Sequence, residues 1–175
     1  MSLGAESFPA GVDGGKVIEF QPAPLVERDF AMNAASPAAM TVETLMTAKV
    51  HCLSPDMTIH EAIGIIINQR ISGAPVVDKN RRVLTVVSEG DLLKLASKVG
   101  LDATVVSCFD RLVKSEQLFT LKKTDTFAHA YMKALAHPVH RFIVVDDRGH
   151  LEGIVSRSNI LRVVYESKKT EFKAS

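Results

Sequence analysis

The sequence predicts an α/β (α+β) fold built from two copies of one β-α-β-β-α unit. An internal repeat is the first reason, because matching residues recur 68 positions apart with no gap between Thr58 and Ala96. The second reason is that strand-like and helix-like patterns follow in the same order in both copies. The third is size, since one copy of about 55–60 residues is marginal as an independent core. The two copies should therefore pack against each other. The matches that set the register are Thr58 with Thr126, Val76-Val77-Asp78 with Val144-Val145-Asp146, and Val87-Ser88 with Val155-Ser156.

Each copy is expected to open with a short strand and a helix. In the first copy the strand covers residues 50–53 and the helix begins near Thr58, where Thr58 and Glu61 have the spacing of a capping box. In the second copy the strand covers residues 118–121 and the helix begins near Thr126. The first of these helices carries an apolar stripe at helical spacing, made by Ile59, Ala62, Ile63 and Ile66.

A hairpin and a second helix complete each copy. The hairpin strands are expected, in chain order, at residues 75–78, 83–87, 142–146 and 151–155. Polar turns join them in pairs. The last helices begin at Ser88 and Ser156.

The chain divides into an arm and the two copies. Glycines and prolines interrupt any periodicity over residues 1–40, which are expected to form a flexible arm with a short extended piece around 17–20. The first copy is assigned to residues 41–100 and the second to residues 101–170, with the connection at about 100–107.

Composition narrows the functional classes. Hydrophobic residues make up 46% of the chain, charged residues make up 23%, and the formal net charge is +1. This balance does not favour broad attraction to nucleic acid or to an anionic membrane. The apolar runs are too short to span a bilayer, and there is no signal-peptide pattern. Two cysteines without a framework of spacings indicate a reducing compartment, and we expect the cytoplasm.

The start of the last helix in each copy is the candidate site. Ser88 and Ser156 each stand beside free backbone N–H groups, which suits a phosphate. Asp91 and Asn159 follow three residues later, where a carboxylate or amide can bind a ribose diol. The same spacings also describe an ordinary capping box at Ser88 and an ordinary N-cap at Ser156, so a purely structural interpretation stands beside the functional one.

The two copies resemble CBS domains, the paired repeats named after cystathionine β-synthase, over about residues 41–167. The motifs that carry the resemblance are Ser72-Gly73-Ala74-Pro75-Val76-Val77-Asp78 with Val86-Val87-Ser88-Glu89-Gly90-Asp91-Leu92-Leu93, and Arg141-Phe142-Ile143-Val144-Val145-Asp146 with Gly153-Ile154-Val155-Ser156-Arg157-Ser158-Asn159-Ile160. The resemblance implies a pair of CBS repeats related by a pseudo-twofold axis, a Bateman module, with two clefts between them. It implies adenosine ligands such as AMP, ADP, ATP, S-adenosylmethionine or NAD, and a homodimer formed through helices.

The resemblance also implies roles for individual residues. Ser156 would contact phosphate, Asn159 would contact ribose, and Gly153 would leave room for the ligand. Ser88 and Asp91 would take the matching roles in the other cleft. The remaining ligand-binding candidates are Gly73, Ala74 and Pro75 near the base, and Arg141 and Arg157 near a phosphate.

This chain departs from the family pattern at a few positions. Thr85 replaces the usual glycine of the first copy and Ile143 replaces the usual proline of the second. Glu89 should repel a phosphate and Arg157 should attract one, so we favour the second-copy cleft if only one is used. Two functions remain open: a non-catalytic ligand sensor that reports to an unknown effector protein, and a ligand-free module for protein interaction or dimerisation.

Other chemistry finds less support. His137 and His140, with His150 on a hairpin, lack the spacing and the further ligands of a metal site, and no metal is expected. Cys52 and Cys108 are expected to be small packing residues rather than nucleophiles. An enzyme with unrecognised chemistry would need a cluster of perturbed ionisable groups in a cleft, and no catalytic residue is predicted.

Overall fold

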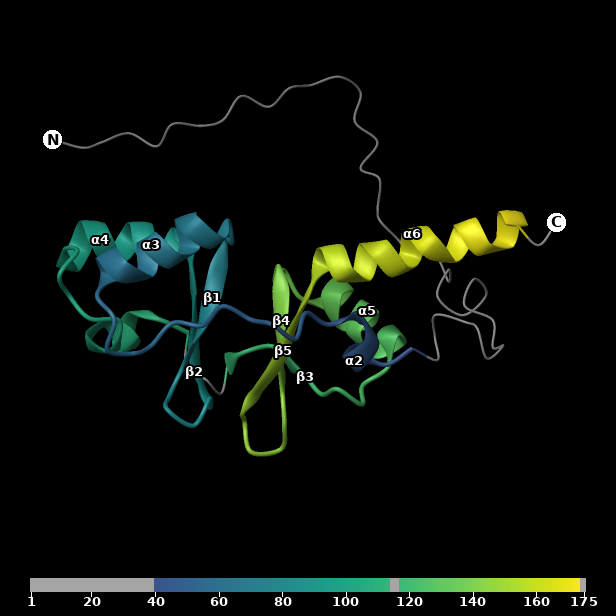
Figure 1. The fold of residues 1–175 in the computed structure, drawn as a ribbon, viewed down its shortest axis with the longest axis horizontal. Coiled ribbons are helices and arrows are strands. Elements are labelled where there is room, and N and C mark those ends of the chain that lie inside the picture. Colours follow the sequence, from purple (N-terminus) through teal and green to yellow (C-terminus); the bar gives the residue numbers. More distant parts are fainter. Residues whose placement is uncertain (1–39, 114–116, 174–175) are drawn as a thin grey trace, which may run out of the picture.

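The computed structural model describes residues 40–113 and 117–173. The predicted arm at residues 1–40, with its extended piece at 17–20, lies outside the described residues except for Met40. Described helices and strands follow the order expected from the repeat (Figure 1).

The first unit contains two helices and a hairpin. Helix α3 (Ile59–Gln69) is followed by strands β1 (Gly73–Val77) and β2 (Val83–Ser88), which pair antiparallel, and by helix α4 (Glu89–Val99). The predicted strand at residues 50–53 is reduced to one bridge, between Leu53 and Val76, because the chain turns directly after Leu53.

The second unit repeats this arrangement with a short additional strand. Its elements are β3 (Thr120–Leu121), α5 (Phe127–Ala136), β4 (Arg141–Val145), β5 (Leu151–Ser156) and α6 (Arg157–Lys173). Strand β3 runs parallel to β4, and β4 runs antiparallel to β5. The predicted α+β fold with two β-α-β-β-α units is confirmed.

The turns and strand starts of the two hairpins meet between the units. The amide of Val83 donates to the carbonyl of Gly149 at 3.0 Å, and the amide of Leu151 donates to that of Arg81 at 2.9 Å. A small apolar cluster forms there from both units, made by Val83, Ile143, Val145 and Leu151. The two units therefore share a core, as the small size of one copy predicts.

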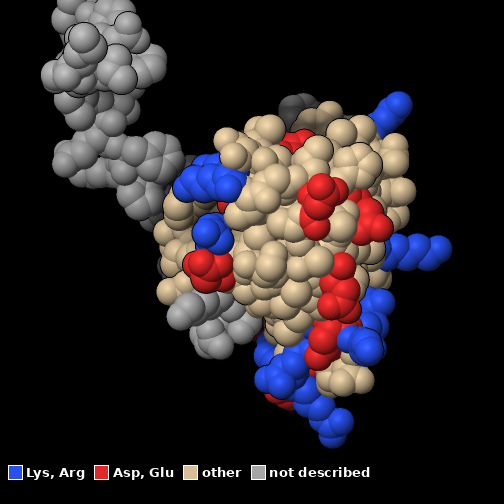
Figure 2. Space-filling model, turned by 90° about the vertical axis from the view of Figure 1, so that its left-hand side faces the viewer, with Lys and Arg blue, Asp and Glu red and all other residues tan. Residues whose placement is uncertain are grey.

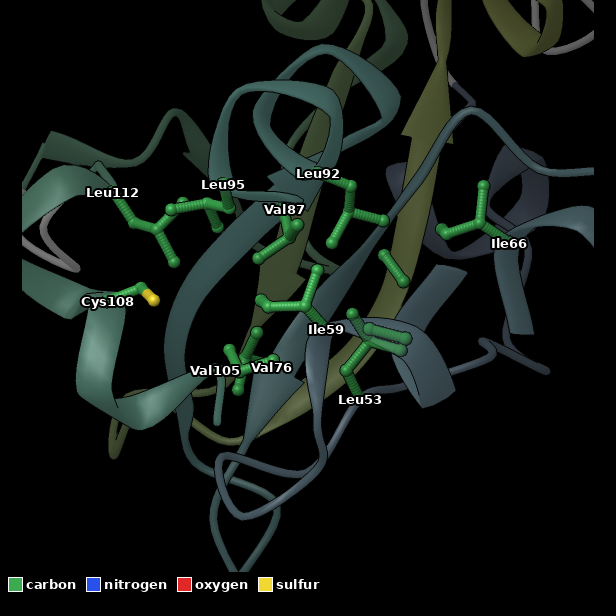
Figure 3. Packing of buried hydrophobic residues seen from close by; sticks show 12 residues of the cluster. Leu53, Ile59, Ile66, Val76, Val87, Leu92, Leu95, Val105, Cys108 and Leu112 are labelled. Carbon is green, nitrogen blue, oxygen red and sulfur yellow. The ribbon is translucent and has the colours of Figure 1, made fainter. Parts of the chain in front are cut away.

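Short segments outside the repeated pattern tie the units together further. Helix α2 (Val42–Leu45) belongs to the core of the second unit, where Val42 is fully buried near Phe127. The 3₁₀ helix η2 (Val106–Arg111) precedes the second unit but packs into the core of the first through Cys108 (Figure 3). Each of the predicted copies, 41–100 and 101–170, therefore contributes a short helix to the core of the other. Those limits themselves stay predictions.

The helix starts have the local chemistry that the sequence predicts. The amide of Glu61 donates to Thr58 Oγ1 at 3.1 Å, and the amide of Thr58 donates to Glu61 Oε2 at 2.8 Å. This reciprocal pair is the predicted capping box. The hydrogen bond from the Thr58 amide lowers the pKa of Glu61. Cys108 is buried, and burial raises the pKa of the half-buried Cys52, so both thiols suit packing rather than nucleophilic chemistry.

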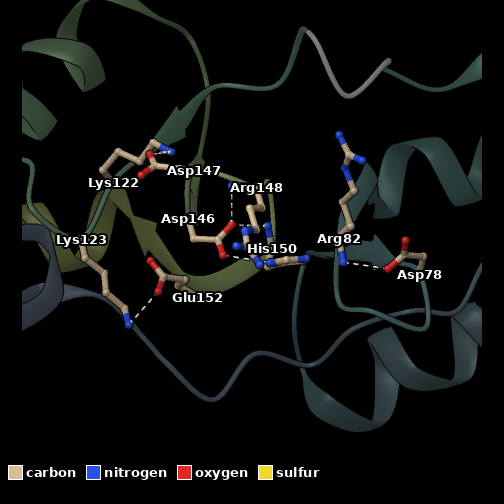
Figure 4. A network of polar contacts seen from close by, with 9 residues as sticks. All are labelled: Asp78, Arg82, Lys122, Lys123, Asp146, Asp147, Arg148, His150 and Glu152. Carbon is tan, nitrogen blue, oxygen red and sulfur yellow. Dashed lines mark hydrogen bonds and ion pairs between the residues drawn. The ribbon is translucent and has the colours of Figure 1, made fainter.

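The turn between β4 and β5 holds a compact polar network (Figure 4). The carboxylate of Asp146 accepts hydrogen bonds from the amides of Arg148 at 2.9 Å and His150 at 2.8 Å, and its other oxygen lies 2.8 Å from His150 Nδ1. The His150 amide, followed by the His150 ring, lowers the pKa of Asp146 to about 2 from 3.8. The charged carboxylate therefore stabilises the turn above its ordinary pKa, and this contribution is lost as pH falls through about 2.

An Asp146→Asn variant should expose this dependence. We expect it to be less stable than the wild type near neutral pH, because the amide accepts these hydrogen bonds less strongly than a carboxylate. The difference should shrink as pH falls below the ordinary pKa of 3.8 and vanish near about 2. Urea unfolding across this range measures it, with Asp147→Asn as control, because the Asp147 side chain is 99% exposed and its ion pair with Lys122 at 2.9 Å lies at the surface, where such pairs contribute little. Equal stability of Asp146→Asn and wild type at neutral pH would contradict this account.

Candidate functional site

A cleft of about 570 Å³ lies between the two units. The first unit contributes Ser72, Gly73 and Val86, together with residues 88–90 at the start of α4. The second unit contributes residues 117–119 directly before β3, residues 138–141 before and at β4, and Ile143. Because its walls come from both units, the shape of this cleft depends on how they are arranged.

The start of α4 forms the polar part of the cleft. Ser88 Oγ donates to Asp91 Oδ2 at 2.6 Å, and the same oxygen accepts from the Ser88 amide at 2.9 Å. The Asp91 amide donates back to Ser88 Oγ at 3.2 Å. This is the capping box that the structural interpretation predicts. The amide of Glu89 donates to the carbonyl of Ser72 at 3.2 Å. In the first turn of α4 this leaves the amide of Gly90 without a hydrogen-bond partner among the described residues, and Gly90 lines the cleft.

Gly73 is required by the close pairing of β1 and β2. A Cβ at this position would stand 2.6 Å from the carbonyl oxygen of Val87 and 3.0 Å from Ser88 Cα, and the φ angle of Gly73 is +156°. Any side chain would push β1 away from the strand that leads into α4. Gly73 thus holds Ser88 at the cleft wall and lines the cleft itself.

Arg141 joins the two units across the cleft. From β4 its guanidinium donates to the carbonyl of Gly73 and to the hydroxyl of Ser72, both in the first unit. Burial lowers the pKa of Arg141, and the negative charge of Glu89 opposes this shift. The predicted candidates Gly73, Ser88 and Arg141 are therefore brought together in one cleft.

The rest of the wall is mostly apolar, and sequence reasoning missed most of it. Val113 and Val139 lie between predicted elements, and Leu118 and Phe119 lie in the strand predicted over residues 118–121, but no motif marks any of them as a site residue. The Phe119 ring packs against His137, with ring centroids 4.4 Å apart. Such walls suit the flat, weakly polar face of a base.

Thr85, which replaces the usual glycine of the first copy, lies outside the lining of this cleft. Its side chain is buried, and its hydroxyl donates to the carbonyl of Val113 at 2.7 Å. Thr85 therefore fixes a wall residue while its own side chain stays out of the lining. Ile143, the other departure from the family pattern, does form part of the wall.

The equivalent residues of the second unit lie outside the lining of this cleft. Ser156 and Asn159 repeat the capping arrangement, with Ser156 Oγ donating to Asn159 Oδ1 at 2.6 Å. The Arg157 guanidinium donates to the carbonyl of His137 at 3.3 Å. The cleft described above contains the helix start of the first copy. The preference for a cleft at the second copy stays a prediction.

Gly153 has a structural partner in this fold. A Cβ there would stand 2.7 Å from Met46 Sδ and 3.1 Å from the carbonyl oxygen of Thr47. Thr47 pairs with Ile154 through two backbone hydrogen bonds of 2.8 and 3.0 Å. The room that Gly153 leaves is thus occupied by residues 46–47, where the sequence predicts room for a ligand.

The other candidates occupy different positions. Ala74 is fully buried and Pro75 is buried in β1, and neither lines the cleft. Asp91 lines a separate cavity of about 110 Å³ behind α4. A ribose contact by Asp91 stays a prediction. His140, considered above only as a metal ligand, lines the cleft beside Arg141.

Two further findings concern metals and membranes. Within residues 40–113 and 117–173, no three side chains of His, Cys, Asp or Glu gather as they would around a metal ion. None of the helices in these ranges has the length and apolar character needed to cross a membrane.

Comparison with known proteins identifies the repeated unit. The family model described as the CBS domain matches residues 42–98 and 108–166. The chain is 29% identical over 166 residues to the CBS domain-containing protein CBSX1, chloroplastic, of Arabidopsis thaliana, covering 79% of this chain and 70% of that protein. It is 29% identical over 107 residues to the 5'-AMP-activated protein kinase subunit gamma-3 of Sus scrofa, covering 59% of this chain but 21% of that subunit.

Solved structures show the same fold. A crystal structure of CBSX2 in complex with AMP aligns with a TM-score of 0.63 at 28% identity, covering 74% of this chain and 98% of that one. CBSX2 comes from Arabidopsis thaliana. The CBS domain pair of protein MJ0100, in complex with 5'-methylthioadenosine and S-adenosyl-L-methionine, aligns with a TM-score of 0.61 at 19% identity, covering 73% and 97%, a likeness that concerns the fold alone.

Proposed function

We propose, from the premise that this chain belongs to the CBS-domain family, that it is a regulatory module that binds an adenosine-containing ligand in the cleft between its two units. No catalysis is part of this proposal. The observation that carries it is the cleft itself, in which the start of α4 and Arg141 provide polar groups beside a mostly apolar wall.

The relatives support an adenine nucleotide as one ligand class. CBSX2 has been crystallised with AMP, and the gamma-3 subunit belongs to a protein kinase that is named 5'-AMP-activated. In this chain the free amide of Gly90 and the guanidinium of Arg141 are the groups able to bind a small anionic or polar substituent. AMP, ADP, ATP and S-adenosylmethionine are the ligands to test.

A sensor of this kind works through differential affinity. Arg141 already joins β4 to Ser72 and Gly73, so a ligand that contacts these groups stabilises one arrangement of the units over others. An effector protein would then read this arrangement. The free thiols of Cys52 and Cys108 support a cytoplasmic setting for this role.

Thermal unfolding with each ligand tests the proposal. A ligand at a hundredfold excess over its dissociation constant should stabilise the folded chain by about 2.7 kcal/mol. Ser88→Ala should remove most of this gain, because it disturbs the helix start that lines the cleft. Thr58→Ala is the matched control: it removes the same kind of cap from α3, away from the cleft. Both variants should lose about 1 kcal/mol without ligand. No gain with any ligand in the wild type would refute the proposal.

A specific observation favours assembly as a second function. Large apolar side chains are exposed at equivalent positions of the two units: Ile67 and Leu135 are 67% and 57% exposed, and Leu93 and Leu161 are 75% and 64% exposed. Seen from the side of the first unit, the surface has a broad area without charged residues (Figure 2). We therefore propose a homodimer formed through these helix faces.

Sedimentation of a charged double variant tests the dimer. The wild type should sediment as a dimer, and Leu93→Glu with Leu161→Glu should shift it to monomer with unchanged helix content. Leu101→Glu is the control, because Leu101 is 45% exposed but lies in the connection after α4. A monomeric wild type at tens of micromolar would contradict the dimer.

A further inference from the structure

The charges around the cleft are few and opposed. Among the described residues that line it, the permanently charged side chains are Glu89 and Arg141. Their formal charges are opposite in sign. The remaining lining is apolar or neutral, apart from the imidazole of His140. Such a cleft has little net attraction for a strongly anionic ligand.

Glu89 stands where a ligand phosphate would be attracted. It is the first residue of α4, and both Glu89 and Asp91 are acidic residues of the first turn. Carboxylates at this position interact favourably with the positive end of the helix, so the field that would attract a phosphate is already opposed by protein charge. The first turn of α6, at the equivalent place in the second unit, has no acidic residue.

Arg141 does not fully offset Glu89. Its guanidinium is already engaged by Gly73 and Ser72. A phosphate chain would have to draw Arg141 away from these partners or share it with them. Glu89, in contrast, is exposed, lines the cleft and takes part in no ion pair within the described residues, so its negative charge acts on a ligand that binds beside it.

From these charges we infer that the cleft selects adenosyl ligands whose 5′ substituent is uncharged or cationic, such as a thioether or a sulfonium, over nucleoside polyphosphates, and that Glu89 sets this preference. This inference rests on the proposed function. It names the ligand class of the same cleft. Each additional negative charge near Glu89 weakens binding, so ATP should bind more weakly than AMP, and AMP more weakly than 5'-methylthioadenosine.

A reporter in the cleft wall can measure binding at this site alone. The chain has no tryptophan, so Val113→Trp introduces a single one. Val113 lines the cleft and is 48% exposed, and its contact with Thr85 runs through the backbone carbonyl, which the substitution keeps. Fluorescence titrations with 5'-methylthioadenosine, S-adenosylmethionine, AMP and ATP then give one affinity each. Calorimetric titration of the chain without the reporter checks the same ratios.

The decisive comparison is Glu89→Gln in the same background. We expect ATP affinity to rise about tenfold at low salt and less at high salt, with the affinity for 5'-methylthioadenosine unchanged within about twofold. Glu43→Gln is the matched control, because Glu43 is an exposed acid in α2 outside the cleft, and it should leave every affinity unchanged.

The possible outcomes separate the two proposals. If the ligands bind and Glu89→Gln leaves the ratio of ATP to 5'-methylthioadenosine affinity unchanged, the charge preference is wrong while the sensor function stands. If none of the four ligands binds either protein, the proposed function fails and this inference fails with it.

Discussion

Replacing Val42 with Asp is expected to destabilise the folded chain by about 4 kcal/mol or more. Val42 is fully buried in α2 and belongs to the same apolar cluster as Leu121, Phe127 and Phe142 of the second unit. The aspartate would place a carboxylate there without a partner. Helix α2 precedes the first unit in the chain but packs into the core of the second. A large loss of stability in the second unit is therefore expected only if α2 packs there.

Chemical unfolding measures the loss, and amide hydrogen exchange locates it. Protection should fall first in α6, which packs against α2, and in α5, whose Phe127 belongs to the same cluster as Val42. Thr44→Asp is the control, since Thr44 lies in the same short helix but is exposed, and it should change stability by less than about 0.5 kcal/mol. If Val42→Asp unfolds at the same denaturant concentration as the wild type, α2 does not belong to this core.

Arg141→Ala is expected to lower stability by about 2–3 kcal/mol and to remove the ligand-dependent gain. The half-buried guanidinium donates to the Gly73 carbonyl and the Ser72 hydroxyl, and hydrogen bonds to charged groups contribute about 1.5–3 kcal/mol. Its loss would leave both acceptors without this donor and loosen one unit against the other. Arg141→Lys should restore part of the stability, because an ammonium can reach one acceptor but lacks the planar fork.

Arg157→Ala provides the comparison for this variant. The Arg157 guanidinium donates to the His137 carbonyl, within the second unit and outside the cleft lining. We expect a change below about 0.5 kcal/mol and an intact response to ligand. Equal losses of stability in Arg141→Ala and Arg157→Ala would show that the contact across the cleft does not hold the units together.

Features that depend on neighbouring residues could be predicted from the sequence. The two capping boxes follow from Ser and Thr with an acid three residues later, and the hairpins follow from apolar runs around a polar turn. The internal repeat also predicted the order of helices and strands, because a pattern found in one copy had to recur in the other. The candidates Gly73, Ser88 and Arg141, chosen from the sequence, lie in one cleft of the structure, and their part in ligand binding stays a prediction.

Features that depend on distant parts of the chain could not be predicted. Nothing local in α2 indicates that Val42 packs near Phe127, more than eighty residues later. The partner of Gly153 is Met46, which lies more than a hundred residues earlier in the chain. Thr85 replaces the usual glycine of the family pattern, and its hydroxyl donates to the carbonyl of Val113 because the chain returns there after η2. Each of these contacts is set by tertiary packing.

A crystal structure of the full chain grown with an excess of AMP or 5'-methylthioadenosine tests the central claim most directly. The account predicts the ligand in the cleft between the units, with its base against the apolar wall near Val86 and Ile143 and its polar end near Gly90 and Arg141. An empty cleft at saturating ligand, or a ligand bound only elsewhere on the molecule, would contradict it.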